Sequence, residues 1–426
     1  MNGQTSSNKQ PPASKRLLKL GLRWVIYLVL ALLLLHEATG NGEIEECSGI
    51  DASAASMSRQ DYRTLVQYAI PDTAQAEKVV LVTIGSMEPD DVRRDFCQQR
   101  FFVARLIHRL KRLNVAVIAL DKFYEPDTCP ADGEETKALL SAVSGIAPVV
   151  TLAARTALIP KSKRGETHVC LSAKPGFDLG LPKRSLGLTR LDADTRRIPL
   201  QWPTLSNGVV TSEETFAFVT AKAFNKDAMR NSLLTTAITK AQQPFSTMVR
   251  IEHHSALEIL CGTKTDQESW KTCYTDEPVE RMNGAVVVIG DHYGEQDLHP
   301  SIGDVGNEPP AVEDDTAPEG LVYGVDLQAN YIAALLDRRY YLPLLPEWGD
   351  QAFVIGFFIV LQVLCWRLHR RLWLAGVIGV ALWGSIALAS FGVLAFTRYL
   401  LTVWVHEINL GTVVVSVLEH WVARMD

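Results

Sequence analysis

The sequence predicts an α/β fold: a mainly parallel sheet with helices on its faces, in an extracytoplasmic domain joined to four transmembrane helices. Short apolar runs rich in β-branched residues alternate with helical patterns along the middle of the chain, which favours parallel strands connected by helices. One long apolar segment precedes this region and three follow it, which indicates the membrane part. We therefore expect one large domain, residues 41–347, in this chain of 426 residues.

The first apolar segment, residues 17–36, is predicted to be an uncleaved transmembrane helix. Four basic residues precede its apolar core at 24–35, and they place the N-terminal tail, residues 1–16, in the cytoplasm. A cleaved signal peptide is the alternative, because a short apolar core also suits such a segment. Residues 36–40 form a poor small-residue cleavage site, which favours the anchor.

The first half of the domain is predicted to alternate between strands and helices. The run Val-Val-Leu-Val-Thr-Ile at 79–84 is typical of a strand buried on both faces. In chain order we predict a strand at 78–84, a helix at 100–113, a strand at 115–120, a helix at 134–143 and a strand at 148–153.

The second half is less regular. We predict a hairpin at 188–200 that turns at 192–194, a helix at 213–224, a strand at 284–289 and a helix at 323–337. Before the last helix, residues 304–319 hold six acidic residues, three prolines and no basic residue. This segment is interpreted as a solvated loop, because its spacing does not match a calcium-binding EF-hand.

Three apolar segments follow the domain. Residues 348–366 and 372–396 are predicted to be transmembrane helices, and the basic turn at 367–371 between them is expected in the cytoplasm. A third pass, residues 400–421, would return the chain to the inside, although a His-Glu pair at 406–407 interrupts it. That pair suits the outer interface or, alternatively, a polar contact between membrane helices.

Six of the seven cysteines lie in the domain, and the seventh, Cys365, lies in an apolar segment. An even number in an exported domain suggests disulfides, although six cysteines allow fifteen connectivities. Cys261 and Cys273 enclose a polar loop and form the favoured pair. The other pairings considered are Cys97 with Cys129 and Cys47 with Cys170. A structural metal site is the alternative, but no Cys/His cluster at zinc spacing is present.

The charge of the domain argues against nucleic-acid binding. Residues 41–349 carry 43 of the 48 acidic and 32 of the 42 basic residues, a formal charge of about −11. No basic stripe with interleaved aromatic residues is present. We therefore expect no nucleic-acid partner.

Polar residues follow three of the predicted strands. Ligands of open α/β sheets bind outside the carboxyl ends of the strands, so these residues are candidates for ligand binding. Carboxylates and imidazole could hold a polar ligand or a metal ion, or they could simply cap helices and fix loops. The candidates are Thr83, Ser86, Asp121, Lys122, Asp291, Asp297 and His299.

Catalysis is not expected. The chain contains no nucleophile elbow, zinc-protease motif, phosphate-binding loop or dinucleotide fingerprint, and we therefore expect no cofactor. The pair His253-His254 is interpreted as an exposed helix start. A hydrolytic metal held by Asp291, Asp297 and His299 is the remaining enzymatic alternative.

Several motifs resemble the second class of CHASE-type extracellular sensory domains, over about residues 78–344. The matching runs are Val-Leu-Val-Thr-Ile at 80–84, Val-Ile-Ala-Leu-Asp at 117–121, Arg-Arg-Ile-Pro-Leu at 196–200, Val-Val-Ile-Gly-Asp at 287–291, Asp-Leu-His-Pro at 297–300 and Gly-Val-Asp-Leu-Gln-Ala-Asn at 324–330. The resemblance implies a domain that binds an extracytoplasmic ligand and signals through membrane helices to a cytoplasmic output domain. Because so few residues follow position 421, we expect the output to lie in a separate partner.

These inferences give two hypotheses. The first is a multi-pass sensor or signal-transduction subunit of the bacterial inner membrane, with both termini in the cytoplasm and the domain in the periplasm. Its expected partners are the lipid bilayer, an unidentified membrane or cytoplasmic signalling protein, and a periplasmic protein or small-molecule ligand. The alternative is a scaffold subunit of a bacterial envelope complex, whose acidic surface would suit a basic protein.

Overall fold

The computed structural model describes most of the domain and two of the predicted membrane helices. The described residues are 77–86, 88–124, 129–130, 132–144, 148–154, 156–158, 170–172, 185–189, 191, 197–206, 209–225, 240–242, 251–262, 270–293, 297–300, 321–337, 342–343, 347–368, 370–397, 399–400 and 417.

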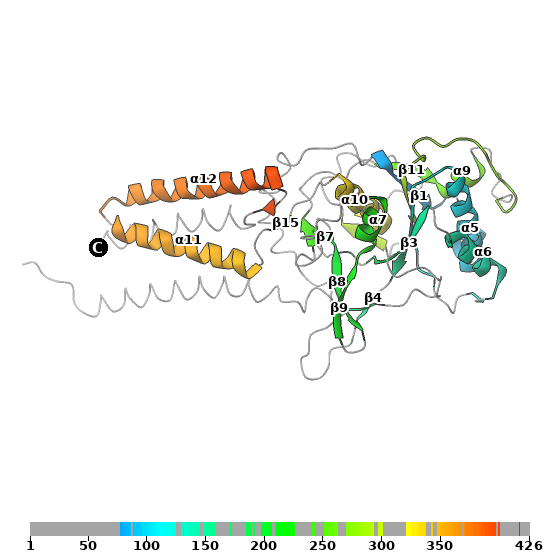
Figure 1. Ribbon diagram of the computed structural model, residues 1–426, viewed down its shortest axis with the longest axis horizontal. Helices are drawn as coiled ribbons and strands as arrows, with labels where there is room; N and C mark the ends of the chain where they lie inside the picture. The colour runs from blue at the N-terminus through cyan, green and yellow to red at the C-terminus, as the bar shows by residue number, and fades with distance from the viewer. Residues whose placement is uncertain are drawn as a thin grey trace, which may run out of the picture.

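A six-stranded sheet forms the centre of the domain (Figure 1), with the strand order β11-β1-β12-β2-β3-β6. Every neighbouring pair is parallel, so the predicted α/β class with a mainly parallel sheet is confirmed. The strands are β1 (Val79–Ile84), β2 (Val117–Asp121), β3 (Val149–Ala154), β6 (Leu186–Leu188), β11 (Glu252–Ser255) and β12 (Val286–Asp291).

Helices cover both faces of this sheet, because its central strands carry apolar side chains on both sides. Val80 and Val82 of β1 pack in one apolar cluster with three helices, whereas Val79 and Leu81 pack in a second cluster with two others. The first group is α5 (Phe96–Arg112), α6 (Glu134–Val143) and α9 (Ala256–Cys261), preceded by the short α4 (Asp90–Arg94). The second group is α7 (Phe216–Phe224) and α10 (Gly324–Leu336).

The helix predicted at 100–113 begins earlier, as α5. Asp95 caps it, because its carboxylate accepts hydrogen bonds from the backbone N–H groups of Cys97 at 2.8 Å and Gln98 at 3.3 Å. The first residue, Phe96, is exposed, and Gln99 is buried. The first turn of α5 therefore lacks the apolar spacing from which the later turns of this helix were predicted.

Smaller sheets surround the main one. A four-stranded sheet has the order β4-β5-β8-β9, and three pairs are β7 with β10, β13 with β14 and β15 with β16. The bounds are β4 (Thr156–Leu158), β5 (Cys170–Ser172), β7 (Arg197–Pro199), β8 (Gln201–Ser206), β9 (Val209–Glu214), β10 (Lys240–Gln242), β13 (Leu298–Pro300), β14 (Leu321–Tyr323), β15 (Leu342–Pro343) and β16 (Tyr399–Leu400).

The hairpin predicted at 188–200 is wrong. Leu188, its first residue, ends β6, which pairs in parallel with β3, whereas Arg197–Pro199 form β7, which pairs with β10. Leu188 is buried with Ala154 of β3 and Trp202 of β8. These apolar contacts, and not the polar turn sequence, determine where β6 lies. The turn at 192–194 and the acidic segment at 304–319 lie outside the described residues.

Two disulfides are present in the described part of the domain, and both involve helices on the same face of the sheet. Cys97 of α5 is joined to Cys129, with a Cα–Cα distance of 5.6 Å. Cys261 of α9 is joined to Cys273, with a Cα–Cα distance of 5.2 Å. The side chains of Cys47 and Cys170 lie outside the description, so their pairing stays a prediction.

Two long helices, α11 (Glu347–Arg367) and α12 (Leu372–Thr397), extend away from the domain (Figure 1). They coincide with the segments predicted to span the membrane. Within the described part of the chain, the stretch Leu372–Val393 is long and apolar enough to cross a bilayer, and Ile355–Arg367 is apolar but shorter. The segments 17–36 and 401–421 fall outside it, apart from residue 417, so the four-pass topology stays a prediction.

The surface of the helix pair differs from that of the domain. Phe357 and Leu361 of α11 pack with Trp383 and Ile386 of α12 between the two helices. Twelve large apolar side chains of the pair are exposed, and they make up most of the exposed large hydrophobic residues in the described chain. They are Ile355, Ile359, Val360, Val363, Trp366, Trp373, Val377, Val380, Leu382, Leu388, Phe391 and Phe396. Such a surface suits contact with lipid.

Candidate functional site

The carboxyl ends of β1, β12 and β2 lie side by side at one edge of the sheet. The strand register pairs Ile84 with Asp291 and Gly290 with Asp121. The chain after β1 and β2 continues to α5 and α6 on one face, whereas the chain after β12 continues to α10 on the other face. This is a topological switch point, the position at which open α/β sheets bind ligands.

Four of the predicted site residues form a charged cluster at this edge. Lys122 is 6% exposed and makes an ion pair with Asp291. Burial lowers the pKa of Lys122, and Asp291 partly offsets that effect. Burial raises the pKa of Asp121 to about 8, the nearby charges of Asp297 and Asp291 add to the rise, and Lys122 opposes it. The cluster thus contains more carboxylates than its one lysine can neutralise.

Asp297 lies against the first turn of α10. A side-chain Cβ at Gly324 would lie 2.5 Å from Asp297 Oδ1, so a larger residue there would force the Asp297 carboxylate to move. At Gly290, a Cβ would lie 2.5 Å from the Cγ2 of Val325, so β12 and α10 are also in close contact. His299 joins the group through Asp297, with 3.5 Å between its Nε2 and the Asp297 Oδ1.

A second polar chain runs from β1 to α10 through two histidines. Thr83 Oγ1 lies 2.6 Å from His253 Nε2, and the rings of His253 and His292 are 5.5 Å apart. His292 Nε2 lies 3.0 Å from Asp326 Oδ2, and its ring is 4.1 Å from that of Tyr323. The Nδ1 atom of His292 is buried and has no hydrogen-bond partner among the described residues.

The interpretation of His253-His254 as an exposed helix start is wrong. Both residues belong to β11, which pairs in parallel with β1, and both are partly buried. The helix α9 begins only at Ala256, after the N-cap Ser255, whose hydroxyl accepts from the N–H of Glu258 at 3.4 Å. These residues form a strand because they pair with β1, which lies far earlier in the chain.

Glu88 is a site neighbour that sequence reasoning missed. It is 1% exposed, and its carboxylate accepts hydrogen bonds from the N–H of Gly85, the hydroxyl of Ser255 at 2.8 Å and the N–H of Leu257 at 3.0 Å. Burial raises the pKa of Glu88, and these hydrogen bonds oppose the rise. The charge of Glu88 also acts on Lys122 and opposes the lowering of its pKa. Nothing in a Met-Glu-Pro loop marks such a carboxylate in advance.

Two tyrosines border the same cluster and were also missed. Burial, followed by the charge of Asp291, raises the pKa of Tyr124 well above its usual value, and Arg100 opposes the rise. The same two causes raise the pKa of Tyr293 to about 12, and Gln99 Nε2 donates to its hydroxyl at 3.1 Å. Both side chains therefore keep neutral hydroxyl groups at ordinary pH.

The seven predicted site residues thus lie around the carboxyl edge of the sheet, although they do not all contact one another. Thr83 belongs to the histidine chain, and the hydroxyl of Ser86 is buried in the turn after β1. Among the described residues, no group of three His, Cys, Asp or Glu side chains could hold a metal ion. Asp291, Asp297 and His299 therefore do not form such a group in this structure, and the hydrolytic-metal alternative gains no support from it.

A polar cluster at the switch point of a parallel sheet is the arrangement of α/β proteins that bind ligands. A family model described as the CHASE2 domain matches residues 28–363. This match covers most of the chain, so the protein belongs to the CHASE2 domain family, a family of extracellular sensory domains, and the resemblance stated from the sequence is confirmed. Neither the curated proteins nor the solved structures gave a significant match.

Proposed function

We propose that this protein is a sensor subunit of the bacterial inner membrane, whose periplasmic domain binds a polar ligand at the carboxyl ends of β1, β2 and β12. One observation carries the proposal: Asp121, Lys122 and Asp291 meet at a switch point of the sheet, beside Thr83 and Asp297. The function is binding, and the proposal assigns no catalytic residue.

Helix α10 supplies a path from this site toward the membrane. Its first turn contacts Asp297 through Gly324 and pairs with His292 through Asp326, so a ligand that moves these groups also moves α10. After α10 the chain forms β15 and then α11. Because β15 pairs with β16, which follows α12, a displacement of β15 reaches both helices of the pair.

The membrane topology in this proposal follows from the surface of α11 and α12. Their turn carries Arg370 and Arg371, and the flanking Trp366 and Trp373 are 68% and 69% exposed. Basic residues favour the cytoplasmic side, and exposed tryptophans favour the interface. We therefore assign the turn to the cytoplasm, the domain to the periplasm, and two further passes to residues 17–36 and 400–421.

Signalling requires only that the ligand binds one arrangement of α10 and the helix pair better than another. The signal would pass to a membrane or cytoplasmic signalling protein. Affinity purification from membranes in mild detergent tests this part. Recovery of a histidine kinase, a cyclase or a regulator supports the sensor, whereas recovery of envelope machinery alone favours the scaffold alternative.

Ligand binding is tested with a pooled small-molecule extract of the bacterial periplasm. Fractions are added to the purified full-length protein, and the thermal midpoint of unfolding is measured. A fraction that raises the midpoint should bind at least tenfold more weakly to Asp291→Asn and to Thr83→Val, a loss of about 1.4 kcal/mol. The control is Lys222→Met, which breaks a different ion pair, to Glu214 at 2.6 Å. Equal binding to the site variants and the control would refute the location.

A further inference from the structure

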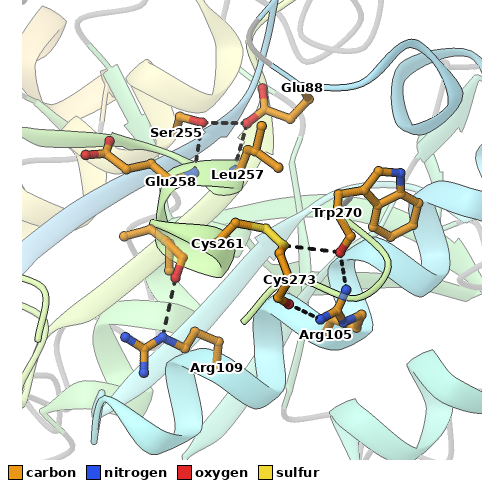
Figure 2. The surroundings of a disulfide bond; sticks show 10 residues. Glu88, Arg105, Arg109, Ser255, Leu257, Glu258, Cys261, Trp270 and Cys273 are labelled. Atoms are coloured by element: carbon orange, nitrogen blue, oxygen red, sulfur yellow. Dashed lines mark hydrogen bonds between the residues drawn. A yellow bond between two sulfur atoms is a disulfide. The ribbon is translucent and has the colours of Figure 1, made fainter. Parts of the chain in front are cut away.

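Glu88 connects the loop after β1 to the first turn of α9. One carboxylate oxygen accepts from the hydroxyl of Ser255 and the N–H of Leu257, at the start of α9 (Figure 2). The other oxygen accepts from the N–H of Gly85, next to Ser86 in the candidate site. A single buried carboxylate therefore holds two segments that are about 170 residues apart in the sequence.

The other end of α9 is held by a disulfide. Cys261, its last residue, is bonded to Cys273, whose Sγ also lies 3.4 Å from the carbonyl oxygen of Trp270 (Figure 2). The segment that carries Cys273 is fixed to α5, because Arg105 donates to the carbonyl oxygens of Trp270 and Cys273. The indole of Trp270 is buried, and its ring makes an edge contact with Phe102 at 5.4 Å.

We propose that the Cys261–Cys273 disulfide is a redox-sensitive latch on the candidate site, with Glu88 as the positioning residue that transmits its state to Gly85 and Ser86. The regulatory part rests on the proposed function, because it assumes that this loop contacts the ligand. The structural part, that the disulfide controls the order of the loop, does not need a ligand.

The physical basis is the shortness of α9. Six residues are too few for a helix to be stable without tertiary support. Support at its C-terminal end comes from the disulfide, and support at its N-terminal end comes from Glu88. If α9 loosens, Glu88 loses the donors from Ser255 and Leu257 and would be left buried with unmet hydrogen bonds. The hydrogen bond from the N–H of Gly85 to the Glu88 carboxylate then loosens together with α9.

The chemistry is a thiol–disulfide exchange with a dithiol. The disulfide accepts two electrons and two protons and becomes the thiols of Cys261 and Cys273, while the dithiol is oxidised to its own disulfide. Both cysteine residues are only partly buried, which favours attack by a dissolved dithiol.

Backbone amide hydrogen exchange of the full-length protein in lipid nanodiscs tests the latch. In the variant Cys261→Ser with Cys273→Ser, exchange in residues 83–88 and 255–258 should become at least fivefold faster. Treatment of the wild type with dithiothreitol should reproduce this change. The matched control is Cys97→Ser with Cys129→Ser, which removes the other disulfide and should leave residues 83–88 unchanged.

Glu88→Gln separates positioning from general destabilisation. This variant keeps the size of the side chain and should also accelerate exchange at 83–88. Combined with the cysteine variant, it should add less than twofold, because both changes release the same loop.

Three outcomes would overturn the latch: acceleration confined to residues 261–273, equal acceleration by the control variant, or fully additive effects. Failure of the proposed function looks different. In that case the loop responds to reduction as described, but no periplasmic extract fraction protects residues 83–88 from exchange.

Discussion

At the scale of single residues, the candidate site is distinguished by carboxylates held in unfavourable surroundings. Asp121 and Asp291 share one buried lysine, the charge of Asp297 acts on Asp121, and Glu88 lies close enough for its charge to affect that lysine. Such arrangements cost stability, and they are concentrated at functional sites. A ligand that brings positive charge or hydrogen-bond donors would relieve the repulsion.

The titration of Asp121 gives a prediction on pH. Its pKa in the folded protein is about 8, against an ordinary value of 3.8. A raised pKa stabilises the fold while the group is protonated, and this contribution is lost as the pH rises from about 4 to about 8. The variant Asp121→Asn does not titrate. Its thermal midpoint relative to the wild type should therefore increase between pH 5 and pH 8 and then level off.

Scanning fluorimetry at several pH values measures this difference. Glu134→Gln, on an exposed carboxylate of α6, controls for the loss of a negative charge. A midpoint difference for Asp121→Asn that stays constant from pH 5 to pH 9 would show that Asp121 is not held protonated.

The contact between Asp297 and α10 gives a second prediction. Because a Cβ at Gly324 would lie 2.5 Å from Asp297 Oδ1, Gly324→Ala should displace the half-exposed Asp297 carboxylate and cost about 1 kcal/mol of unfolding free energy. In an Asp297→Ala background most of that cost should disappear, because the clashing carboxylate is gone. Gly356→Ala, at a glycine with open space around its Cβ position, is the control. Equal costs in both backgrounds would mean that the two groups do not meet.

At the scale of elements, the buried strands were the most predictable part of the fold. The runs that became β1, β2 and β12 consist mainly of Val, Ile, Leu and Ala, since both faces of these strands are covered. Their ends therefore located Thr83, Asp121 and Asp291 from the sequence alone. The position of β12 between β1 and β2 could not be predicted, because it depends on contacts across about 170 residues.

The residues that were missed share a cause. Glu88, His253 and His292 carry no local pattern, and each acquires its role only through a partner far away in the chain. The hairpin at 188–200 failed for a related reason, since a turn-like sequence does not say which strand each arm will pair with. Local patterns thus predicted which elements form, and tertiary contacts decided their partners.

The disulfide in α9 gives a prediction at this scale. It closes a short loop, because its two cysteines are 12 positions apart in the sequence, and it should contribute about 2–4 kcal/mol. Cys261→Ser and Cys273→Ser should therefore lower the accumulated level of the protein equally, and the double variant should be no worse than either. Immunoblotting of membranes measures the level. Alkylation mapping of the oxidised protein that finds thiols at both positions would refute the pairing.

At the scale of the whole molecule, the chain combines a sensory domain with a pair of helices whose exposed surface is largely apolar. The turn between α11 and α12 carries Arg370 and Arg371, and many large apolar residues of both helices are exposed. A reporter that is active only in the cytoplasm, fused to either terminus, should therefore be active. A reporter active only in the periplasm, fused to the C-terminus, should be silent. The reverse pattern at the C-terminus would overturn the four-pass topology.

The central claim is that a ligand at the carboxyl edge of the sheet acts on the membrane helices through α10. The most direct measurement is hydrogen exchange of the full-length protein in nanodiscs, with and without a periplasmic extract fraction that raises its thermal midpoint. We expect slower exchange at residues 83–88, 119–122 and 289–293, together with altered exchange in the first turn of α10 and in β15. Protection restricted to the four-stranded sheet β4-β5-β8-β9, with the carboxyl edge and α10 unchanged, would contradict it.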